Sequence, residues 1–198
     1  MNDIFILIGP TASGRSNLAI KLVNKFPFEI INADLFSAYR DLSIGTAKPS
    51  KEELNRYKHH LINILEPTMQ YNVSQYCADA TKSIEEILSS NKIPLITGGS
   101  MMYVYQLLNG LSHEYDITDT DLKLVEFIQN TYTNKQIFKS ISNYNPDLTD
   151  KINSNDSYRL EKIMLRLISN KSNRKNFKGL YKDKNIKIHT IYIAINDR

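Results

Sequence analysis

A glycine-bounded segment near the start of the chain, residues 9–16, has the spacing of a loop that binds phosphate groups. It reads GPTASGRS and follows the pattern G-x-x-x-x-G-K-[ST], except that Arg15 replaces the lysine. Glycines let backbone N–H groups converge on phosphate oxygens, Arg15 could neutralise charge on a leaving group, and Ser16 could ligate Mg²⁺. The alternative is a glycine turn that only caps a helix. We expect ligand contacts from the whole loop: Gly9, Pro10, Thr11, Ala12, Ser13, Gly14, Arg15 and Ser16.

Two further polar residues, Asp34 and Ser100, each follow a short apolar run that is typical of a buried strand. Parallel strands end at one edge of a sheet, and open α/β sheets bind ligands at that edge. We therefore expect both side chains to lie beside the phosphate loop. A carboxylate there could serve as a general base and a hydroxyl could contact phosphate, although each residue taken alone could also be only a helix or turn cap.

The elements that must position these residues alternate between strands and helices. Buried strands are predicted over residues 4–8, 28–31 and 93–97, and 60–65 is a further strand candidate. Helices are predicted at 15–26, at 51–57, at 74–88 with Ser74 as N-cap, and at 101–108. This order predicts an α/β fold, a P-loop NTPase-like parallel sheet flanked by helices.

The pattern predicts three parts along the chain. Residues 1–115 form the α/β core, and 116–184 form a small helical insertion with apolar positions at helical spacing. Residues 185–198 bring a return strand back to the core, since 186–195 is a run of near-alternating apolar residues.

Positive charge is concentrated late in the chain, whose net charge is +4. Between Tyr158 and Lys187 only Glu161 and Asp183 oppose ten basic residues. Such a block suits a polyanion such as RNA, although a solvated face would have the same composition. The basic residues are Arg159, Lys162, Arg166, Lys171, Arg174, Lys175, Lys178, Lys182, Lys184 and Lys187.

Composition indicates a globular protein of a reducing compartment. Of the 198 residues, 41% are hydrophobic and 23% are charged, and the single cysteine, Cys77, allows no internal disulfide. The first apolar run is short, contains Asp3 and lacks a basic region before it, so it is a poor signal peptide and too short to cross a membrane. We expect a cytoplasmic protein with no membrane partner.

Four segments, in order, are similar to motifs of the tRNA dimethylallyltransferase family. Residues 9–16 resemble its GPTASGK[ST] loop, and 34–49, DLFSAYRDLSIGTAKP, resemble D-S-x-Q-V-Y-R-x-x-D-I-G-T-A-K-P. Residues 59–67, HHLINILEP, resemble H-H-L-I-D-I-L-x-P, and 94–103, PLITGGSMMY, resemble P-x-x-V-G-G-T-x-x-Y. A weaker match, NDSYRLEK at 155–162, is similar to N-D-x-Q-R-L-x-R.

The resemblance implies a reaction and roles for single residues. A dimethylallyl group passes from dimethylallyl diphosphate to the exocyclic amine (N6) of the adenine 3′ of the anticodon, flipped out of its stack. Asp34 is then the base or acceptor for that amine, Ser100 and Arg15 contact the diphosphate, and Mg²⁺ assists. The implied partner is the anticodon stem-loop of tRNA, bound by a monomer. The implied tRNA contacts are Asp34, Leu35, Phe36, Ser37, Lys123, Tyr158, Arg159, Leu160, Glu161 and Lys162.

Departures from the family pattern keep other hypotheses open. Arg15 replaces lysine, Leu35 and Ser37 replace Ser and Gln, and Lys123 and Lys162 replace arginines. Residues 191–198 resemble the strand that precedes the family's C-terminal helices, so we expect a shortened homologue or a remainder on another polypeptide. The alternatives are a catalytically impaired or dead P-loop homologue that only binds RNA or a partner, an adenylate isopentenyltransferase, and a small-molecule kinase.

Overall fold

The chain folds into two compact units. The computed structural model describes residues 2–46, 48–111, 115–171 and 177–194. Unit 1 comprises Met1–Leu111 and Phe177–Arg198, and unit 2 comprises Ser112–Asn176.

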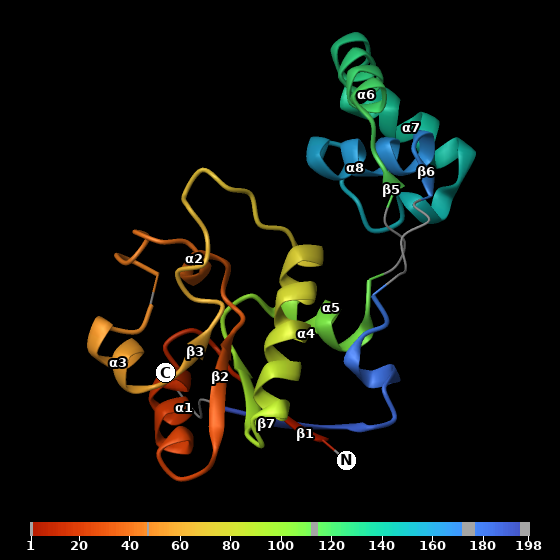
Figure 1. The fold of residues 1–198 in the computed structure, drawn as a ribbon. Helices are drawn as coiled ribbons and strands as arrows, with labels where there is room; N and C mark the ends of the chain where they lie inside the picture. The colour runs from red at the N-terminus through yellow and green to blue at the C-terminus, as the bar shows by residue number, and fades with distance from the viewer. Residues whose placement is uncertain (1, 47, 112–114, 172–176, 195–198) are drawn as a thin grey trace. The chain divides into compact units, whose positions relative to one another are not determined.

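Unit 1 is built on a five-stranded parallel sheet, as the sequence pattern predicts (Figure 1). Its order is β3-β2-β4-β1-β7, and every neighbouring pair is parallel. The third strand is shorter than the predicted 60–65, because Leu61 and Asn63 have positive φ angles of 62° and 55° that end the extended backbone. The strands are β1 (Asn2–Ile8), β2 (Phe28–Asn32), β3 (His59–His60), β4 (Ile93–Thr97) and β7 (Ile186–Tyr192).

Helices cover both faces of this sheet. Because side chains alternate along β1, Ile4 and Ile6 pack into one apolar cluster and Leu7 into another. The first cluster contains buried residues of α4 (Val73–Ser89) and α5 (Met101–Asn109), and the second contains Ala19 of α1 (Arg15–Val23). The remaining helices of the first 111 residues are the short α2 (Leu35–Ala38) and α3 (Lys51–Arg56).

Helix α4 begins one residue earlier than expected. Asn72 is its N-cap: the Asn72 side chain accepts the N–H of Gln75, and the Gln75 side chain accepts the N–H of Asn72. The predicted cap, Ser74, therefore lies in the first turn. Ser and Asn both cap well, and the reciprocal pair with Gln75 favours Asn72.

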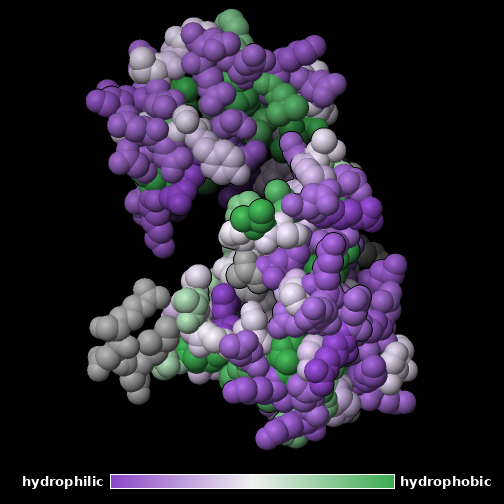
Figure 2. All heavy atoms as spheres, turned by 90° about the vertical axis from the view of Figure 1, so that its left-hand side faces the viewer, coloured by the Kyte–Doolittle hydropathy of each residue, from purple (hydrophilic) through white to green (hydrophobic). Residues whose placement is uncertain are grey.

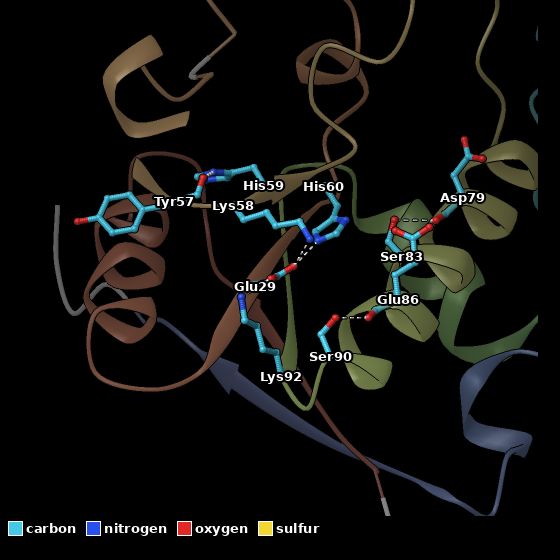
Figure 3. Close-up of polar contacts among 10 residues, drawn as sticks. All are labelled: Glu29, Tyr57, Lys58, His59, His60, Asp79, Ser83, Glu86, Ser90 and Lys92. Atoms are coloured by element: carbon cyan, nitrogen blue, oxygen red, sulfur yellow. Dashed lines mark hydrogen bonds and ion pairs between the residues drawn. The ribbon is translucent and has the colours of Figure 1, made fainter. Parts of the chain in front are cut away.

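The amino ends of three strands are joined by one buried carboxylate, Glu29 of β2 (Figure 3). Glu29 is 3% exposed, and its oxygens lie 2.7 Å from His60 Nε2, 3.1 Å from Lys58 Nζ and 2.6 Å from Lys92 Nζ. Burial alone would raise the pKa of Glu29, but hydrogen bonds from Lys92, His60 and Lys58 outweigh burial and lower the pKa to about 2. The carboxylate is therefore charged in the folded protein at neutral pH.

Unit 2 has its own apolar core. Val125 of α6 (Asp119–Thr131), Ile137 and Ile141 of α7 (Asn134–Tyr144), and Leu160 of α8 (Ser157–Ile168) are buried together. The other elements are β5 (Tyr115–Asp116), the 3₁₀-helix η1 (Pro146–Leu148) and β6 (Asn170–Lys171), which pairs antiparallel with β5.

The chain rejoins unit 1 at Phe177, whereas the sequence pattern predicts Asn185 as the first residue of the return. Phe177 and Leu180, which begins η2 (Leu180–Lys182), pack into the same apolar cluster as α5. A Cβ on Gly179 would lie 2.2 Å from Gly110 N, so the backbones of these two residues can come this close only because residue 179 is a glycine. The contact between the segments around Gly110 and Gly179 therefore determines where the chain returns to unit 1. The local pattern of apolar residues carries no information about such a contact.

Hydrophilic side chains cover most of the visible face of the molecule, broken by separate apolar patches (Figure 2). Among the described residues, no helix combines the length and apolar character needed to cross a membrane.

Candidate functional site

A cavity of about 260 Å³ opens in unit 1 where β2 and β4 end. Arg15 and Ser16 line it from the end of the glycine loop, and Asp34 lines it from the turn after β2. Gly98 and Gly99 line it from the turn after β4. These residues are far apart in sequence and meet because their strands are parallel and end at one edge.

The glycine loop contributes its last two residues to this cavity. Gly14 has a φ of 82° at the N-cap position of α1, a conformation that glycine adopts without strain. Ser13 Oγ lies 2.9 Å from where a Cβ on Gly9 would be, so the loop closes on a residue that lacks a side chain. The residues from Gly9 to Gly14 lie outside the cavity lining, so of the eight predicted phosphate contacts only Arg15 and Ser16 line it.

Arg15 connects the glycine loop to the turn after β4. Its Nη1 donates to the carbonyl oxygen of Gly98, and both residues line the cavity. A lysine has no second nitrogen for such a bond, so the arginine can hold the turn and still present donors to an anion.

Asp34 serves both of the roles that its sequence position allows. One carboxylate oxygen, Oδ1, accepts the backbone N–H of Phe36 at 3.0 Å and of Ser37 at 3.4 Å, and so caps α2. The other, Oδ2, lies 2.7 Å from where a Cβ on Gly99 would be. One oxygen is therefore held by the helix, and the other faces the glycine turn that lines the cavity.

Ser100 holds two turns together and lies outside the cavity lining. Its Oγ accepts the N–H of Leu35 at 3.2 Å, and its backbone N–H donates to the carbonyl oxygen of Ala33 at 2.9 Å. It occupies the N-cap position of α5 without a side-chain cap bond. In this structure the hydroxyl fixes the turn that carries Asp34.

The three residues after Asp34 lie in different environments. Ser37 is buried and lines the cavity, Leu35 packs against the core, and Phe36 is 59% exposed. Only Ser37 of the three reaches the cavity directly.

Several residues that line the cavity are not among the predicted site residues, and Asn32, Lys48 and His59 are polar members of this group. Lys48 Nζ donates to the carbonyl oxygen of Tyr39 at 2.6 Å and to Asn63 Oδ1 at 2.9 Å, and burial lowers its pKa. Burial likewise lowers the pKa of His59, whose Nδ1 bonds the Tyr57 carbonyl oxygen at 2.8 Å. Lys48 and His59 stand in family-like segments, and Asn32 is the last residue of a predicted strand, but nothing in the sequence indicates which way they face.

The predicted RNA contacts of unit 2 are mostly exposed. Tyr158, Arg159 and Lys162 lie on the outer side of α8, with Lys162 Nζ 5.2 Å from the centre of the Tyr158 ring. Lys123 of α6 is exposed as well, and Glu161 lies 3.6 Å from Lys162. Leu160 is 0% exposed and packs in the core of unit 2, so its side chain offers no surface for contact.

The basic block is divided between the two units. Arg159, Lys162 and Arg166 belong to α8 in unit 2, whereas the four lysines from Lys178 to Lys187 belong to unit 1. Arg174 and Lys175 lie outside the described residues. The ten residues lie in one stretch of the sequence, but those that the structure describes belong to two units.

Comparisons with known proteins agree with one another. A family model described as IPP transferase matches residues 37–198. The tRNA dimethylallyltransferase of Legionella pneumophila (strain Corby) is 38% identical over 161 residues, which cover 81% of this chain and 51% of that protein. That of Coxiella burnetii (strain Dugway 5J108-111) is 39% identical over 159 residues, which cover 80% of this chain and 51% of that protein.

Solved structures give the same fold. A eukaryotic dimethylallyltransferase acting on tRNA superposes with a TM-score of 0.74 at 24% identity, covering 97% of this chain and 48% of that one. A full-length tRNA isopentenylpyrophosphate transferase from Bacillus halodurans superposes with a TM-score of 0.53 at 28% identity, covering 84% of this chain and 55% of that one. The chain spans about half the length of the curated relatives it matches.

Proposed function

The chain belongs to the IPP transferase family, and from this premise we propose that it transfers a dimethylallyl group from dimethylallyl diphosphate to the exocyclic amine (N6) of an adenine in tRNA. The observation that carries the proposal is the convergence of Arg15, Ser16, Asp34 and the Gly98–Gly99 turn on one cavity. An anion site and a carboxylate in one cavity suit a reaction that releases diphosphate and removes a proton from an amine.

The bond changes assign a role to each side of the cavity. The carbon–oxygen bond of the donor breaks and the diphosphate leaves with its electron pair, while a bond forms between the amine nitrogen and the same carbon. Arg15 stabilises the negative charge that develops on the diphosphate from within the cavity. Contacts from Ser100 and from the backbone of residues 9–14, which lie outside the cavity lining, stay predictions from the family resemblance. Asp34 Oδ2 accepts the proton that the amine loses. Ile20, Ile30 and Ile62 give the cavity an apolar part for the five-carbon group.

A magnesium ion fits the donors that this cavity offers. Ser16 lines it with a hydroxyl, and Mg²⁺ commonly takes one or two protein oxygens with its remaining positions filled by phosphate oxygens and water. The described residues contain no cluster of three His, Cys, Asp or Glu side chains that could hold a metal ion without a substrate. Bound there, the ion would neutralise charge on the diphosphate.

The acceptor that we propose is the adenine 3′ of the anticodon, in the anticodon stem-loop. Leu35, Phe36 and Ser37 follow Asp34 directly, and the exposed Phe36 offers a face on which a flipped base can stack. The exposed cations of α8 and Lys123 suit the phosphate backbone of a stem. We expect the chain to act as a monomer in the cytoplasm.

The direct test is incubation with dimethylallyl diphosphate, Mg²⁺ and an anticodon stem-loop RNA, followed by mass spectrometry of the nucleosides. We expect dimethylallyl adenosine, and a loss of at least about 100-fold in rate for Asp34→Asn because the amide cannot accept the proton. Asp150→Asn changes an exposed carboxylate of unit 2 and serves as the matched control.

Each alternative function predicts a different result in this assay or in a parallel measurement of RNA affinity or phosphoryl transfer. Salt-dependent RNA affinity with no product identifies a homologue that only binds. Product on free AMP but not on RNA identifies an adenylate isopentenyltransferase. Phosphoryl transfer from ATP to a small molecule identifies a kinase.

A further inference from the structure

Asn32 is a buried polar residue in the lining of the cavity. It is the last residue of β2, stands two positions before Asp34 and is 8% exposed. Asn32 lines the cavity. All five residues of β2 are buried. A buried amide in a strand needs partners for both its nitrogen and its oxygen.

The nitrogen of this amide is fully engaged. Asn32 Nδ2 donates to the carbonyl oxygen of Asp34 at 2.9 Å and to that of Leu61 at 3.0 Å. Carbonyl oxygens only accept, so these two bonds fix which end of the amide is nitrogen. The same two bonds tie the backbone of Asp34 to Leu61, whose φ of 62° is unusual for a residue with a side chain.

No described residue donates a hydrogen bond to Asn32 Oδ1. Among the described residues, two side-chain atoms are both fully buried and without a hydrogen-bond partner, Ser13 Oγ and Tyr76 Oη. Asn32 Oδ1 is not one of them, so this oxygen keeps some accessible surface. Because Asn32 lines the cavity, a molecule that fills the cavity can supply the missing donor.

We propose that Asn32 Oδ1 accepts one N–H of the adenine's exocyclic amine while Asp34 accepts the other, an inference that rests on the proposed function. An exocyclic amine carries two N–H groups, and a single carboxylate engages one of them. An amide oxygen holds the second without competing for the proton, since it is not basic at neutral pH. With both N–H groups held, the amine cannot rotate and its lone pair has one fixed direction.

This arrangement also makes Asn32 a determinant of base specificity. A base that carries a carbonyl oxygen in place of the amine would bring its acceptor against Asn32 Oδ1. Two acceptors face to face cannot bond, and the desolvated oxygen would remain unpaired. The pair of Asn32 and Asp34 therefore selects adenine and rejects hypoxanthine.

The test compares stem-loop RNAs that carry adenine, purine or hypoxanthine at the target position, with binding measured in the presence of inorganic diphosphate and Mg²⁺. Purine lacks the amine and is otherwise the same base. For the unaltered protein we expect affinity to fall from adenine to purine to hypoxanthine. In Asn32→Ala the preference for adenine over purine should shrink about fivefold to tenfold, the value of one hydrogen bond.

A purely structural role predicts a different pattern. If Asn32 only holds the turn of Asp34, Asn32→Ala weakens all three RNAs equally and the ratios stay unchanged, which overturns the inference. Asn109→Ala removes the amide of an exposed asparagine outside the cavity lining, so it should leave the adenine-to-purine ratio unchanged. An equal change of the ratio in Asn109→Ala would also overturn the inference.

A second variant and a comparison made with the unaltered protein alone complete the test. Should Asn32→Ala unfold, Asn32→Ser keeps a small polar side chain and is measured in its place. The comparison of hypoxanthine with purine needs no variant, and equal affinity of the unaltered protein for these two RNAs contradicts the inference. Failure of the unaltered protein to prenylate the adenine RNA contradicts the proposed function itself, whereas prenylation with unchanged ratios contradicts only the role of Asn32.

Discussion

At the scale of single residues, the cavity depends on two neighbouring glycines that are needed for different reasons. A Cβ on Gly98 would lie 2.1 Å from the carbonyl carbon of Ala33, which is backbone and cannot yield. A Cβ on Gly99 would lie 2.7 Å from Asp34 Oδ2, the far end of a side chain that can rotate away. The first glycine allows two turns of the fold to pack, and the second leaves room for the carboxylate.

Substitution of each glycine by alanine should separate folding from turnover. We expect Gly98→Ala to lower the free energy of unfolding by about 3 kcal/mol, because a backbone segment must move. Gly99→Ala should change it by less than about 1 kcal/mol yet reduce prenyl transfer at least about tenfold, because Asp34 Oδ2 is displaced. Urea unfolding and the nucleoside assay measure the two effects. A Gly99→Ala protein with unchanged turnover would show that the position of Oδ2 does not matter.

At the scale of elements, Glu29 connects β2 with the residues that begin β3 and β4. Its partners Lys58 and Lys92 have side chains that are 61% and 46% exposed, so water can solvate them if the carboxylate is removed. His60 has a side chain that is 9% exposed and cannot be solvated as easily. The two buried groups of the cluster, the Glu29 carboxylate and the His60 ring, therefore depend most on these bonds (Figure 3).

The pH dependence of this cluster has a definite sign. The pKa of Glu29 is lowered from 4.5 to about 2, so the charged form is favoured by the fold. The stabilisation, about 3 kcal/mol for such a difference in pKa, is complete above pH 4.5 and is lost as the pH falls toward 2. Glu29→Gln should lower the free energy of unfolding by about 2 kcal/mol at pH 7 and by less at pH 3.

Urea unfolding at the two pH values measures this, with the exposed Glu126→Gln as the matched control. An equal effect of Glu29→Gln at pH 7 and pH 3 would contradict the assignment, because the loss would then be independent of the carboxylate's charge.

At the scale of the whole molecule, each unit has an apolar core of its own. The buried residues of α6, α7 and α8 form one cluster, and those around the five-stranded sheet form two others. The cavity with Arg15 and Asp34 is lined entirely by residues of unit 1. Stability of unit 2 and affinity for diphosphate are therefore expected to be separable properties.

Leu160→Ala tests this separation. Leu160 is fully buried in unit 2, so the truncation should cost that unit about 3 kcal/mol through lost contacts and the cavity that remains. Leu167→Ala, on the same helix at 43% exposure, should cost less than about 1 kcal/mol. Calorimetry with and without inorganic diphosphate measures both units, and we expect the affinity for diphosphate to be unchanged in either variant. A weaker affinity in Leu160→Ala alone would show that the units are coupled.

Element types and family could be read from residue order alone, since they depend on neighbours in the sequence. Apolar runs at 4–8, 28–31 and 93–97 predict buried strands and the ordered motifs predict the family, and both predictions are confirmed. Of the predicted loop at 9–16, residues 9–14 lie between β1 and α1 and the last two begin α1, whereas phosphate binding by this loop stays a prediction. The direction of a side chain could not be read in this way. Asp34 divides its oxygens between a helix cap and the cavity, and Asn32 turns its amide to Leu61, because segments distant in sequence pack against them.

The same reason explains why one run of basic residues belongs to two units and why the chain rejoins the core at Phe177. Contacts between distant segments are a property of packing, and no local pattern encodes them.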